Sequence, residues 1–331
     1  MRVVITGGGG FLGTRLARAI LQRGSLTDPS GLETRVRELV LVDIAPSGTF
    51  EDERVQVMSG DLTDRAFVER AITPDTRSVF HLAAVVSGQA EADFDLGMRV
   101  NLDASRALLE CCRRCDAPPR FVFTSSLAVF GGPLPDPVPD TAALTPQSSY
   151  GAQKAACELL VYDMTRKGYI DGRSLRLPTV TVRPGPPNRA ASGFASGIIR
   201  EPLAGVTAVC PVKPETRMWV ISPAAAVHNL LCGHEAPAAR FSHTRSVNVP
   251  GISVTVADMV RALREMAGDE VANRVRWEYD PVIDRIVSSW PAAFDTRLGA
   301  SLGMIADPDF TAIVRAFRDE MHMPPDGRPA S

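Results

Sequence analysis

The stretch Arg2-Val-Val-Ile-Thr-Gly-Gly-Gly-Gly-Phe-Leu-Gly13 decides the fold of this chain. Its first five residues read as a buried strand, and residues 11–23 follow as a helix. Between them, glycines at positions 7, 10 and 13 allow a tight turn, close approach of phosphates to the backbone, and close helix–strand packing. A merely flexible turn would not need a strand before it and a helix after it. The stretch therefore predicts a phosphate-binding loop at a helix amino terminus.

The same alternation of short apolar runs and helical segments continues through the first half of the chain. The runs are continuous rather than alternating, which is typical of parallel strands buried on both faces. Strand–helix alternation predicts an α/β fold with a doubly wound parallel sheet. The further strands are predicted at 38–43, 55–58, 78–82 and 121–124, and the helices at 64–72, 96–115 and 149–167.

The composition and pattern of the sequence change after Pro184, where proline and glycine become frequent and the predicted strands become isolated. We expect a nucleotide-binding domain over residues 1–177, completed by parts of 216–249. A smaller substrate-binding region is expected from 178–215 and 250–323, followed by a frayed tail at 324–331. Within these parts we predict a strand at 174–183, helices at 255–267 and 309–322, and an inserted loop at 25–34.

Composition excludes several classes of protein. The net charge of −2 provides no basic field for nucleic acid or an anionic membrane. No apolar run approaches the roughly 20 residues that cross a bilayer. Cys112-Arg-Arg-Cys115 has no second cysteine pair to complete a zinc site, and the six cysteines lack disulfide-framework spacing. We expect a cytoplasmic protein without a metal, a nucleic-acid partner or a membrane partner.

Asp43 ends the second predicted strand, where an acid accepts hydrogen bonds from the ribose hydroxyls of a dinucleotide. A carboxylate at this position repels a 2′-phosphate, so NAD is favoured over NADP. The interval from Gly13 to Asp43 is longer than the usual ~20 residues, and the predicted loop at 25–34 accounts for the excess. A surface acid that merely ends a strand is the alternative.

Tyr150 and Lys154 lie four residues apart at the start of a predicted long helix, which puts both side chains on one helical face. A lysine cation lowers the pKa of a neighbouring phenol, which can then accept the proton of an alcohol as hydride leaves. The strand ending in Thr124-Ser-Ser126 brings hydroxyl groups to the sheet edge where ligands gather. From the spacing alone, the default interpretation would be a surface tyrosine beside an exposed lysine, without a catalytic role.

Taken together with His81-Leu-Ala-Ala84, Asn101 and Asp61-Leu62, these motifs resemble the signature of extended short-chain dehydrogenases, the NAD-dependent epimerase/dehydratase family. The resemblance implies a Rossmann domain, with Tyr150 and Lys154 catalytic and the catalytic hydroxyl on Ser126 or the adjacent Ser125. It also implies a homodimer formed by the helix that carries Tyr150 and the helix at 96–115. The implied cofactor-binding residues are Gly7, Gly10, Phe11, Leu12, Gly13, Asp43, Asp61, Leu62, Leu82, Ala83, Ala84, Asn101, Thr124, Tyr150, Lys154, Pro178 and Val180.

Four further segments, at 81–95, 130–136, 144–150 and 194–202, resemble the members of this family that oxidise four-carbon sugar acids at the C2 hydroxyl. Arg217-Met-Trp-Val-Ile-Ser-Pro223 keeps the arginine of nucleotide-sugar enzymes but loses their histidine and aspartate. An arginine in that pocket can grip a carboxylate instead. The expected substrate-binding residues are Ser87, Ser125, Ser126, Tyr150, Arg183, Ser192 and Arg217.

Two other functions remain open at this point. A sugar-nucleotide 4-epimerase or dehydratase would retain its NAD and return the hydride to an intermediate. A non-catalytic NAD sensor would use the same fold to bind partners. The fold cannot exclude it, because a fold does not imply a function. Such a sensor has no need of Tyr150 and Lys154, and a dehydratase would place an acid where Leu127 stands.

Overall fold

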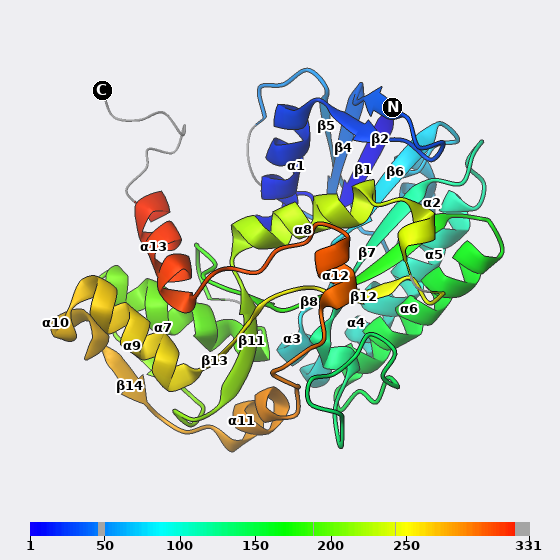
Figure 1. The fold of residues 1–331 in the computed structure, drawn as a ribbon. Helices are drawn as coiled ribbons and strands as arrows, with labels where there is room; N and C mark the ends of the chain where they lie inside the picture. Colours follow the sequence, from blue (N-terminus) through cyan, green and yellow to red (C-terminus); the bar gives the residue numbers. More distant parts are fainter. Residues whose placement is uncertain (46–49, 188, 242, 322–331) are drawn as a thin grey trace.

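The computed structural model describes residues 1–45, 50–187, 189–241 and 243–321 (Figure 1). Its centre is a seven-stranded parallel sheet in the order β12-β8-β7-β6-β1-β4-β5. This is the Rossmann arrangement that the alternating strands and helices predict. The strands are β1 (Arg2–Thr6), β4 (Glu38–Asp43), β5 (Val55–Ser59), β6 (Thr76–His81), β7 (Arg120–Ser126), β8 (Asp171–Leu177) and β12 (Ser246–Asn248).

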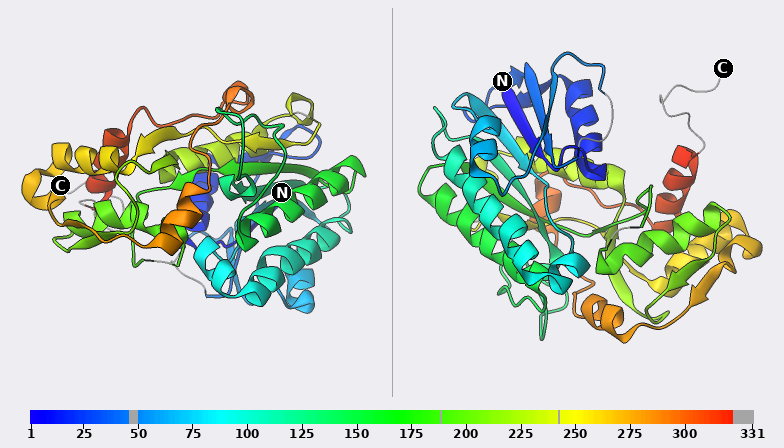
Figure 2. Two further views of the ribbon diagram at one scale, coloured as in Figure 1. Left: turned by 90° about the horizontal axis from the view of Figure 1, so that it is seen from below. Right: turned by 180° about the vertical axis from the view of Figure 1, so that it is seen from behind.

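Helices cover both faces of the sheet because successive side chains of each strand point to opposite sides. Val3 and Ile5 of β1 share a core with the helices of one face, and Val4 belongs to the core of the other face. All five residues of β1 are buried, as its continuous apolar pattern predicts. The helices are α1 (Phe11–Arg23) and α8 (Pro223–Glu235) on the first face, and α2 (Arg65–Ala71), α5 (Ala104–Cys112) and α6 (Ser149–Arg166) on the second (Figures 1 and 2).

Two predicted elements differ from the structure. The segment at 25–34 is an antiparallel hairpin, β2 (Ser25–Thr27) and β3 (Glu33–Arg35), rather than a loop. The single strand predicted at 174–183 ends at Leu177, and β9 (Thr179–Val180) joins a separate sheet. Pro178 lies at the break, where its missing N–H prevents the central ladder from continuing.

The helix predicted at 96–115 is continuous but irregular. It consists of α4 (Phe94–Gly97), a π-helical turn η1 (Met98–Asp103) and α5. Short helices follow two sheet strands at the edge that carries the glycine loop. These are α3 (Ser87–Ala92) after β6 and the 3₁₀ turn η2 (Leu127–Val129) after β7.

The carboxyl-terminal part of the chain builds a smaller lobe beside this edge of the sheet (Figures 1 and 2). Ile199, Met259, Leu263 and Val314 belong to its own apolar core. Two small sheets cross it, in the orders β13-β11-β9 and β10-β14. Its elements are η3 (Ala191–Gly193), α7 (Phe194–Leu203), β10 (Ala208–Cys210), β11 (Arg217–Ile221), β13 (Ile252–Thr255), α9 (Val256–Ala267), α10 (Asp269–Ala272), β14 (Val275–Trp277), α11 (Pro281–Ser288) and α13 (Phe310–Met321).

Two short helices complete the described chain, η4 (Ala238–Arg240) and α12 (Arg297–Ser301). Residues 324–331, where a frayed tail is expected, lie outside the described residues. In the described part of the chain, no helix is long and apolar enough to cross a membrane.

Candidate active site

The glycine loop between β1 and α1 has room only for glycine at its two ends. Gly7 has a φ of +70°, and a Cβ on it would meet the backbone nitrogen of Ala83 at 2.8 Å. A Cβ on Gly13 would meet the carbonyl oxygen of Gly7 at 2.1 Å. Gly10 is the N-cap of α1, so the free backbone N–H groups of that helix start at the loop. The loop thus provides the cradle that an anionic pyrophosphate needs.

Asp43 lies directly beside this loop in spite of its long sequence interval. Its Oδ2 accepts a hydrogen bond from the backbone nitrogen of Gly9 at 3.1 Å, and its Oδ1 accepts one from Ile44 at 2.8 Å. The hairpin of β2 and β3 takes up the additional residues. The carboxylate stands where the ribose hydroxyls of a dinucleotide held by the loop would reach it.

A chain of buried polar groups connects β1 with the helices behind the site. His81 contacts Thr6 Oγ1 through Nδ1 at 2.6 Å and Ser105 Oγ through Nε2 at 2.7 Å. Burial lowers the pKa of His81 to about 3, so the imidazole is neutral. The backbone nitrogen of Leu82 donates to Thr6, which fixes the segment that continues into Ala83.

Asn101, expected among the cofactor-binding residues, makes hydrogen bonds inside the protein. Its Oδ1 accepts from the backbone nitrogen of Val85 at 2.8 Å, and its Nδ2 donates to Gln153 Oε1 at 2.8 Å. Both Asn101 and Gln153 are 2% exposed. This pair fastens the π-helical turn to α6, the helix that carries Tyr150 and Lys154.

The two serines at the end of β7 have different environments. Ser125 is buried and donates to Glu158 Oε1, and Glu158 in turn pairs with Arg176. Ser126 is only half-buried, and its Oγ accepts from the backbone nitrogen of Ala128 at 3.1 Å. It is also hydrogen-bonded to Tyr150. The structure therefore presents Ser126, and not Ser125, beside the tyrosine.

Tyr150 and Lys154 both lie in the first turns of α6, whose N-cap Ser148 accepts from the backbone of Gly151. The Lys154 ammonium is 5.7 Å from the centre of the Tyr150 ring and donates to the carbonyl oxygen of Thr124 at 2.9 Å. Burial lowers the pKa of Lys154 to about 8.

The lowering of the Tyr150 pKa by Lys154, expected from the sequence, is not found. Burial raises the pKa of Tyr150 to about 12, and the hydrogen bond with Ser126 only opposes this rise. Desolvation of the phenolate is therefore stronger than the stabilisation that its neighbours give in the protein alone.

The remaining residues expected at the cofactor are spread over the same edge of the sheet. Phe11 lies at the start of α1 under the guanidinium of Arg15, and Asp61 and Leu62 follow β5. Leu82, Ala83 and Ala84 follow β6 and are half-buried. Of the others, Leu12 and Gly13 are in α1, Thr124 is in β7, Pro178 separates β8 from β9, and Val180 is in β9.

The other residues expected at the substrate come from two parts of the chain: Ser87 begins α3 at the sheet edge, and Arg183, Ser192 and Arg217 belong to the smaller lobe. Ser87 is buried and accepts from the backbone of Ala191, so it holds η3, which contains Ser192, against α3. Arg217 in β11 is exposed and lines a small crevice with Leu127 and Thr179. Arg183, half-buried beyond β9, donates to the carbonyl oxygen of Pro186 at 3.3 Å.

Comparison with known proteins identifies the fold family. The model of the NAD dependent epimerase/dehydratase family matches residues 3–219, which is more than half of the chain. This chain belongs to the NAD-dependent epimerase/dehydratase family. The match includes the glycine loop, Asp43, the serines of β7 and the Tyr150–Lys154 helix, so the family resemblance of the sequence is confirmed.

Three similar members of the epimerase/dehydratase family stand out. A D-erythronate dehydrogenase of Cupriavidus necator is 56% identical over 97% of this chain and 98% of its own length. A D-erythronate dehydrogenase of Haemophilus influenzae is 43% identical over 96% and 98%. The crystal structure of a nucleoside-diphosphate-sugar epimerase from Agrobacterium tumefaciens has a TM-score of 0.89 at 39% identity, covering 99% of this chain and 95% of that one.

Sequence reasoning missed Gln153 and Glu158 in this epimerase/dehydratase chain. Both are buried on α6, one beside Lys154 and the other one turn further along. A polar residue on a helix reads as solvent-facing unless its partner is known, and here the partners Asn101 and Arg176 come from distant segments. Among the described residues there is no group of three or more side chains that could hold a metal ion.

Proposed function

We propose that this chain oxidises the C2 hydroxyl of D-erythronate with NAD, giving 2-dehydro-D-erythronate and NADH. One observation carries the proposal: Ser126, Tyr150 and Lys154 meet at the same sheet edge as the glycine loop with its adjacent carboxylate. Its support from relatives is a sequence identity of 56% to a D-erythronate dehydrogenase over 97% of this chain.

The described residues fit NAD. The cradle formed by Gly7 and Gly13 would be filled by any side chain at these positions, and Asp43 offers its carboxylate beside it. The dinucleotide would be held by the loop, Asp43 and the amino terminus of α1, and its bound nicotinamide supplies the hydride acceptor. Asp43 would repel the 2′-phosphate of NADP, so we expect NAD to be preferred.

The protein's own residues manage the proton and the orientation of the substrate. Ser126 already accepts a hydrogen bond from Ala128, so its hydroxyl proton is free to be donated to the substrate oxygen or to Tyr150. Tyr150 takes the proton of the C2 hydroxyl at its phenolic oxygen. Lys154 does not lower the Tyr150 pKa in the protein alone, so we assign it this part only with NAD and the substrate bound: its ammonium, fixed by the carbonyl oxygen of Thr124 at 5.7 Å from the centre of the Tyr150 ring, then stabilises the phenolate.

The substrate carboxylate requires a cation, and Arg217 is the one we assign to it. Its guanidinium is exposed, donates to Ser253 Oγ at 3.1 Å, and lies 3.9 Å from the exposed Asp136. A solvent-exposed ion pair of this kind contributes little stabilising free energy, so a substrate carboxylate could displace Asp136 from Arg217. Arg183 is the second candidate for the carboxylate, and Ser87 and Ser192 remain proposed partners of the substrate hydroxyls.

The second candidate is a nucleotide-sugar epimerase, favoured by the similarity to the Agrobacterium tumefaciens structure. An epimerase returns the hydride and releases no NADH. Purified protein is therefore incubated with NAD and D-erythronate while NADH absorbance is followed. Net NADH formation that is lost in Tyr150→Phe, with NAD binding intact, supports the dehydrogenase. Absence of NADH with D-erythronate and related sugar acids would overturn it, and UDP-sugars are then tested for epimerisation.

We further propose that the chain acts as a cytoplasmic homodimer. All six cysteines are free thiols, as a reducing compartment requires. On the outer face of α6, Leu159 is 62% exposed, which suits an apolar contact between two copies. Light scattering of Leu159→Arg against wild type tests the dimer, because an unchanged mass would contradict a contact through α6.

A further inference from the structure

A small crevice lies between the end of β7 and the smaller lobe, beside the hydroxyl of Ser126. Leu127, the next residue in the chain, forms one of its walls, and Arg217 of β11 lines it as well. In a 2-hydroxy acid the carboxylate carbon is bonded directly to C2, the carbon that reacts at Ser126 and Tyr150. The crevice is therefore where the carboxylate of such a substrate is expected. The other residues that line it are Thr179, Met218, Trp219, Val287, Trp290 and Pro291.

Two of these residues are brought to the crevice by different elements of the smaller lobe. In β9, Val180 packs against the main core, so Thr179 before it points to the opposite face of the strand. Trp290 follows the end of α11, where its backbone nitrogen donates to the carbonyl oxygen of Val287 at 3.2 Å. Its ring packs both on the core of the smaller lobe and on the apolar cluster that contains Leu127.

The polar side chains in the crevice are hydrogen-bond donors with unused capacity. Arg217 donates one bond, to Ser253 Oγ, and keeps further N–H groups. Within the described part of the chain, the hydroxyl of Thr179 and the indole N–H of Trp290 donate to no other group. No acidic side chain of the described residues lines the crevice. A carboxylate, which only accepts hydrogen bonds, matches such a set of donors.

The size of the crevice limits what can enter it. Its volume is about 10 Å³, which is room for about one water-sized group. An oxygen of a carboxylate has this size, whereas a phosphate group or a sugar ring is much larger. The crevice therefore favours a carboxylate at C1 over the bulkier groups of nucleotide sugars.

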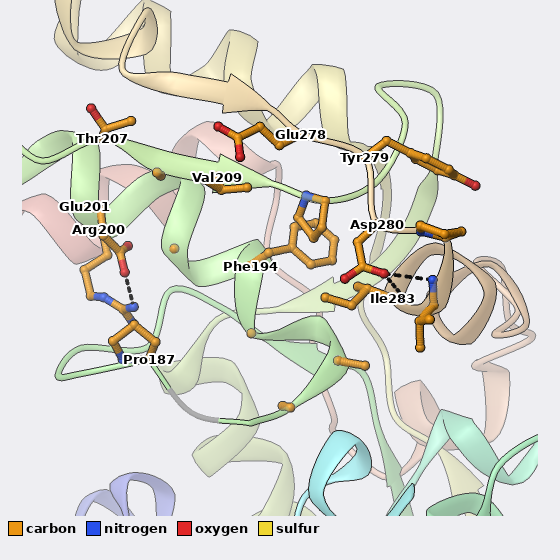
Figure 3. Close-up of a pocket in the computed structure, with 18 residues that line it drawn as sticks. Pro187, Phe194, Arg200, Glu201, Thr207, Val209, Glu278, Tyr279, Asp280 and Ile283 are labelled. Atoms are coloured by element: carbon orange, nitrogen blue, oxygen red, sulfur yellow. Dashed lines mark hydrogen bonds and ion pairs between the residues drawn. The ribbon is translucent and has the colours of Figure 1, made fainter. Parts of the chain in front are cut away.

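A much larger cavity, of about 950 Å³, lies between α7, β10 and the segment that joins β14 to α11 (Figure 3). Glu201, Glu278 and Asp280 line this cavity, against the single guanidinium of Arg200. Ser126 does not line it. The excess of acids disfavours a carboxylate there, so the crevice beside Leu127 is the better place for it.

We propose that Thr179 and Trp290 bind the substrate carboxylate together with Arg217 and make the protein specific for an acid at C1. The inference rests on the proposed function, whose reaction places a carboxylate next to C2. The guanidinium supplies the charge, and the Thr179 hydroxyl and the Trp290 indole each donate one hydrogen bond. Leu127 closes the crevice on the side of Ser126.

The test measures binding apart from turnover. The full chain is titrated by calorimetry with saturating NADH, which cannot take up a hydride. D-erythronate is compared with erythritol, and glycolate with ethylene glycol, because in each neutral compound a hydroxymethyl group replaces the carboxylate. We expect each acid to bind at least about tenfold more tightly than its neutral counterpart.

Two substitutions remove one donor each and keep the shape of the crevice. Thr179→Val removes the hydroxyl, and Trp290→Phe removes the indole N–H and keeps an aromatic ring. Each should weaken the binding of both acids, and raise KM for D-erythronate, by about tenfold or more. The change in kcat should be much smaller, because binding to the carboxylate is the same in the ground state and the transition state.

Two further variants separate binding from structure. Thr179→Ser retains the hydroxyl and should bind the acids as wild type does. Trp219 lines the same crevice, but its indole N–H donates to the carbonyl oxygen of Val249 at 3.3 Å. Trp219→Phe should therefore lower the Tm and leave the affinity for both acids unchanged.

The outcomes distinguish this inference from the proposed function. Unchanged affinity for the acids in Thr179→Val and Trp290→Phe would overturn the inference, even if wild type forms NADH from D-erythronate. Equal weakening of the acids and their neutral counterparts would also overturn it, because the two residues would then hold a hydroxyl. Acid binding that is lost in both variants, in a protein that forms no NADH from D-erythronate, would support the inference and refute the proposed function alone.

Discussion

Ser125 and Ser126 are adjacent in the chain, yet they differ in what they contact. The hydroxyl of Ser125 is committed to the buried carboxylate of Glu158, and that of Ser126 to the phenol of Tyr150. Ser126→Ala should lower kcat for sugar-acid oxidation by about 10²-fold or more, because it removes a polarising hydrogen bond from the transition state.

Ser125→Ala is the matched control for this substitution. It should lower the midpoint of urea unfolding while retaining most of kcat, because the hydroxyl that it removes belongs to the structural network. Loss of kcat in Ser125→Ala with unaltered stability would reverse the assignment of the two serines.

The pH dependence of the reaction follows from two groups whose pKa values are shifted by burial in opposite directions. Tyr150, with a pKa of about 12, must be deprotonated to act as a base, and Lys154, with a pKa of about 8, must be protonated to assist it. Below pH 8 the fraction of phenolate rises tenfold per pH unit while Lys154 stays charged. Above pH 8 the loss of the lysine charge offsets this rise.

We therefore expect kcat/KM for the oxidation to rise with pH up to about 8 and then to level off. In Lys154→Arg the cation persists at every accessible pH, so the rise should continue above pH 8 even if the activity is lower. Steady-state rates over pH 6–10 measure both profiles. A plateau at the same pH in the variant would contradict the role of Lys154.

At the level of single residues, the sequence could predict part of the candidate site. Tyr150, Lys154 and Asp43 could be named because regular spacing on a helix or at a strand end fixes where a side chain lies. The choice between Ser125 and Ser126 could not be made, since it depends on the strand's neighbours. The partners of Asn101 could not be named for a related reason: Val85 and Gln153 are brought to it by the tertiary fold.

Among the elements, α6 and the turn η2 depend most closely on each other for the geometry of the site. A Cβ on Gly151 would meet the carbonyl oxygen of Ala128 at 2.1 Å, so the helix can approach the turn only with glycine there. Gly151→Ala should displace the first turn of α6 and lower kcat at least about tenfold, since displacements near 1 Å are costly in catalysis. Gly197→Ala adds the same methyl to α7 without a backbone clash and should keep kcat.

The same dependence on neighbours explains which elements could be predicted. The strands β1 and β4 and the helix α1 have the boundaries that their apolar patterns predict, because both faces of the sheet are buried and the pattern is continuous. The hairpin of β2 and β3 was missed, although its Leu26 is fully buried in the main core, because three-residue strands are too short to show a period.

For the whole molecule, a buried network joins segments that are far apart in the sequence. Arg176 of β8 pairs with Glu158 of α6, donates to Asn248 of β12 and to the carbonyl oxygen of Asp140 in the loop that precedes α6. Asp140 accepts a bond from the backbone nitrogen of Asn248. Through these contacts the last strand of the sheet and the loop next to the site are held together.

The stability of the protein should therefore depend on pH through Asp140. Burial raises the pKa of this carboxyl to about 6, so the folded state favours the protonated form. An acid whose pKa is raised by folding contributes most stability below its ordinary pKa of about 4 and loses that contribution as the pH rises to about 6. Asp140→Asn keeps the acceptor for Asn248 and removes the charge.

We expect this variant to have a higher Tm than wild type at pH 7.5 and an equal Tm at pH 4, as measured by scanning calorimetry. Asp319→Asn, an exposed position on α13, is the control and should change neither value. A lower Tm of Asp140→Asn at pH 7.5 would show that the ionised carboxylate stabilises the fold.

The π-helical turn at Met98–Asp103 has a consequence for how this protein can tolerate changes in length. A turn of this kind holds one residue more than an α-helical turn, and each helical residue corresponds to a rotation of about 100°. Deleting one residue within it would restore regular winding and turn Asn101 away from Gln153 while leaving α5 packed. A deletion, usually tolerated only in surface loops, would here produce a folded protein whose catalytic helix has lost its anchor.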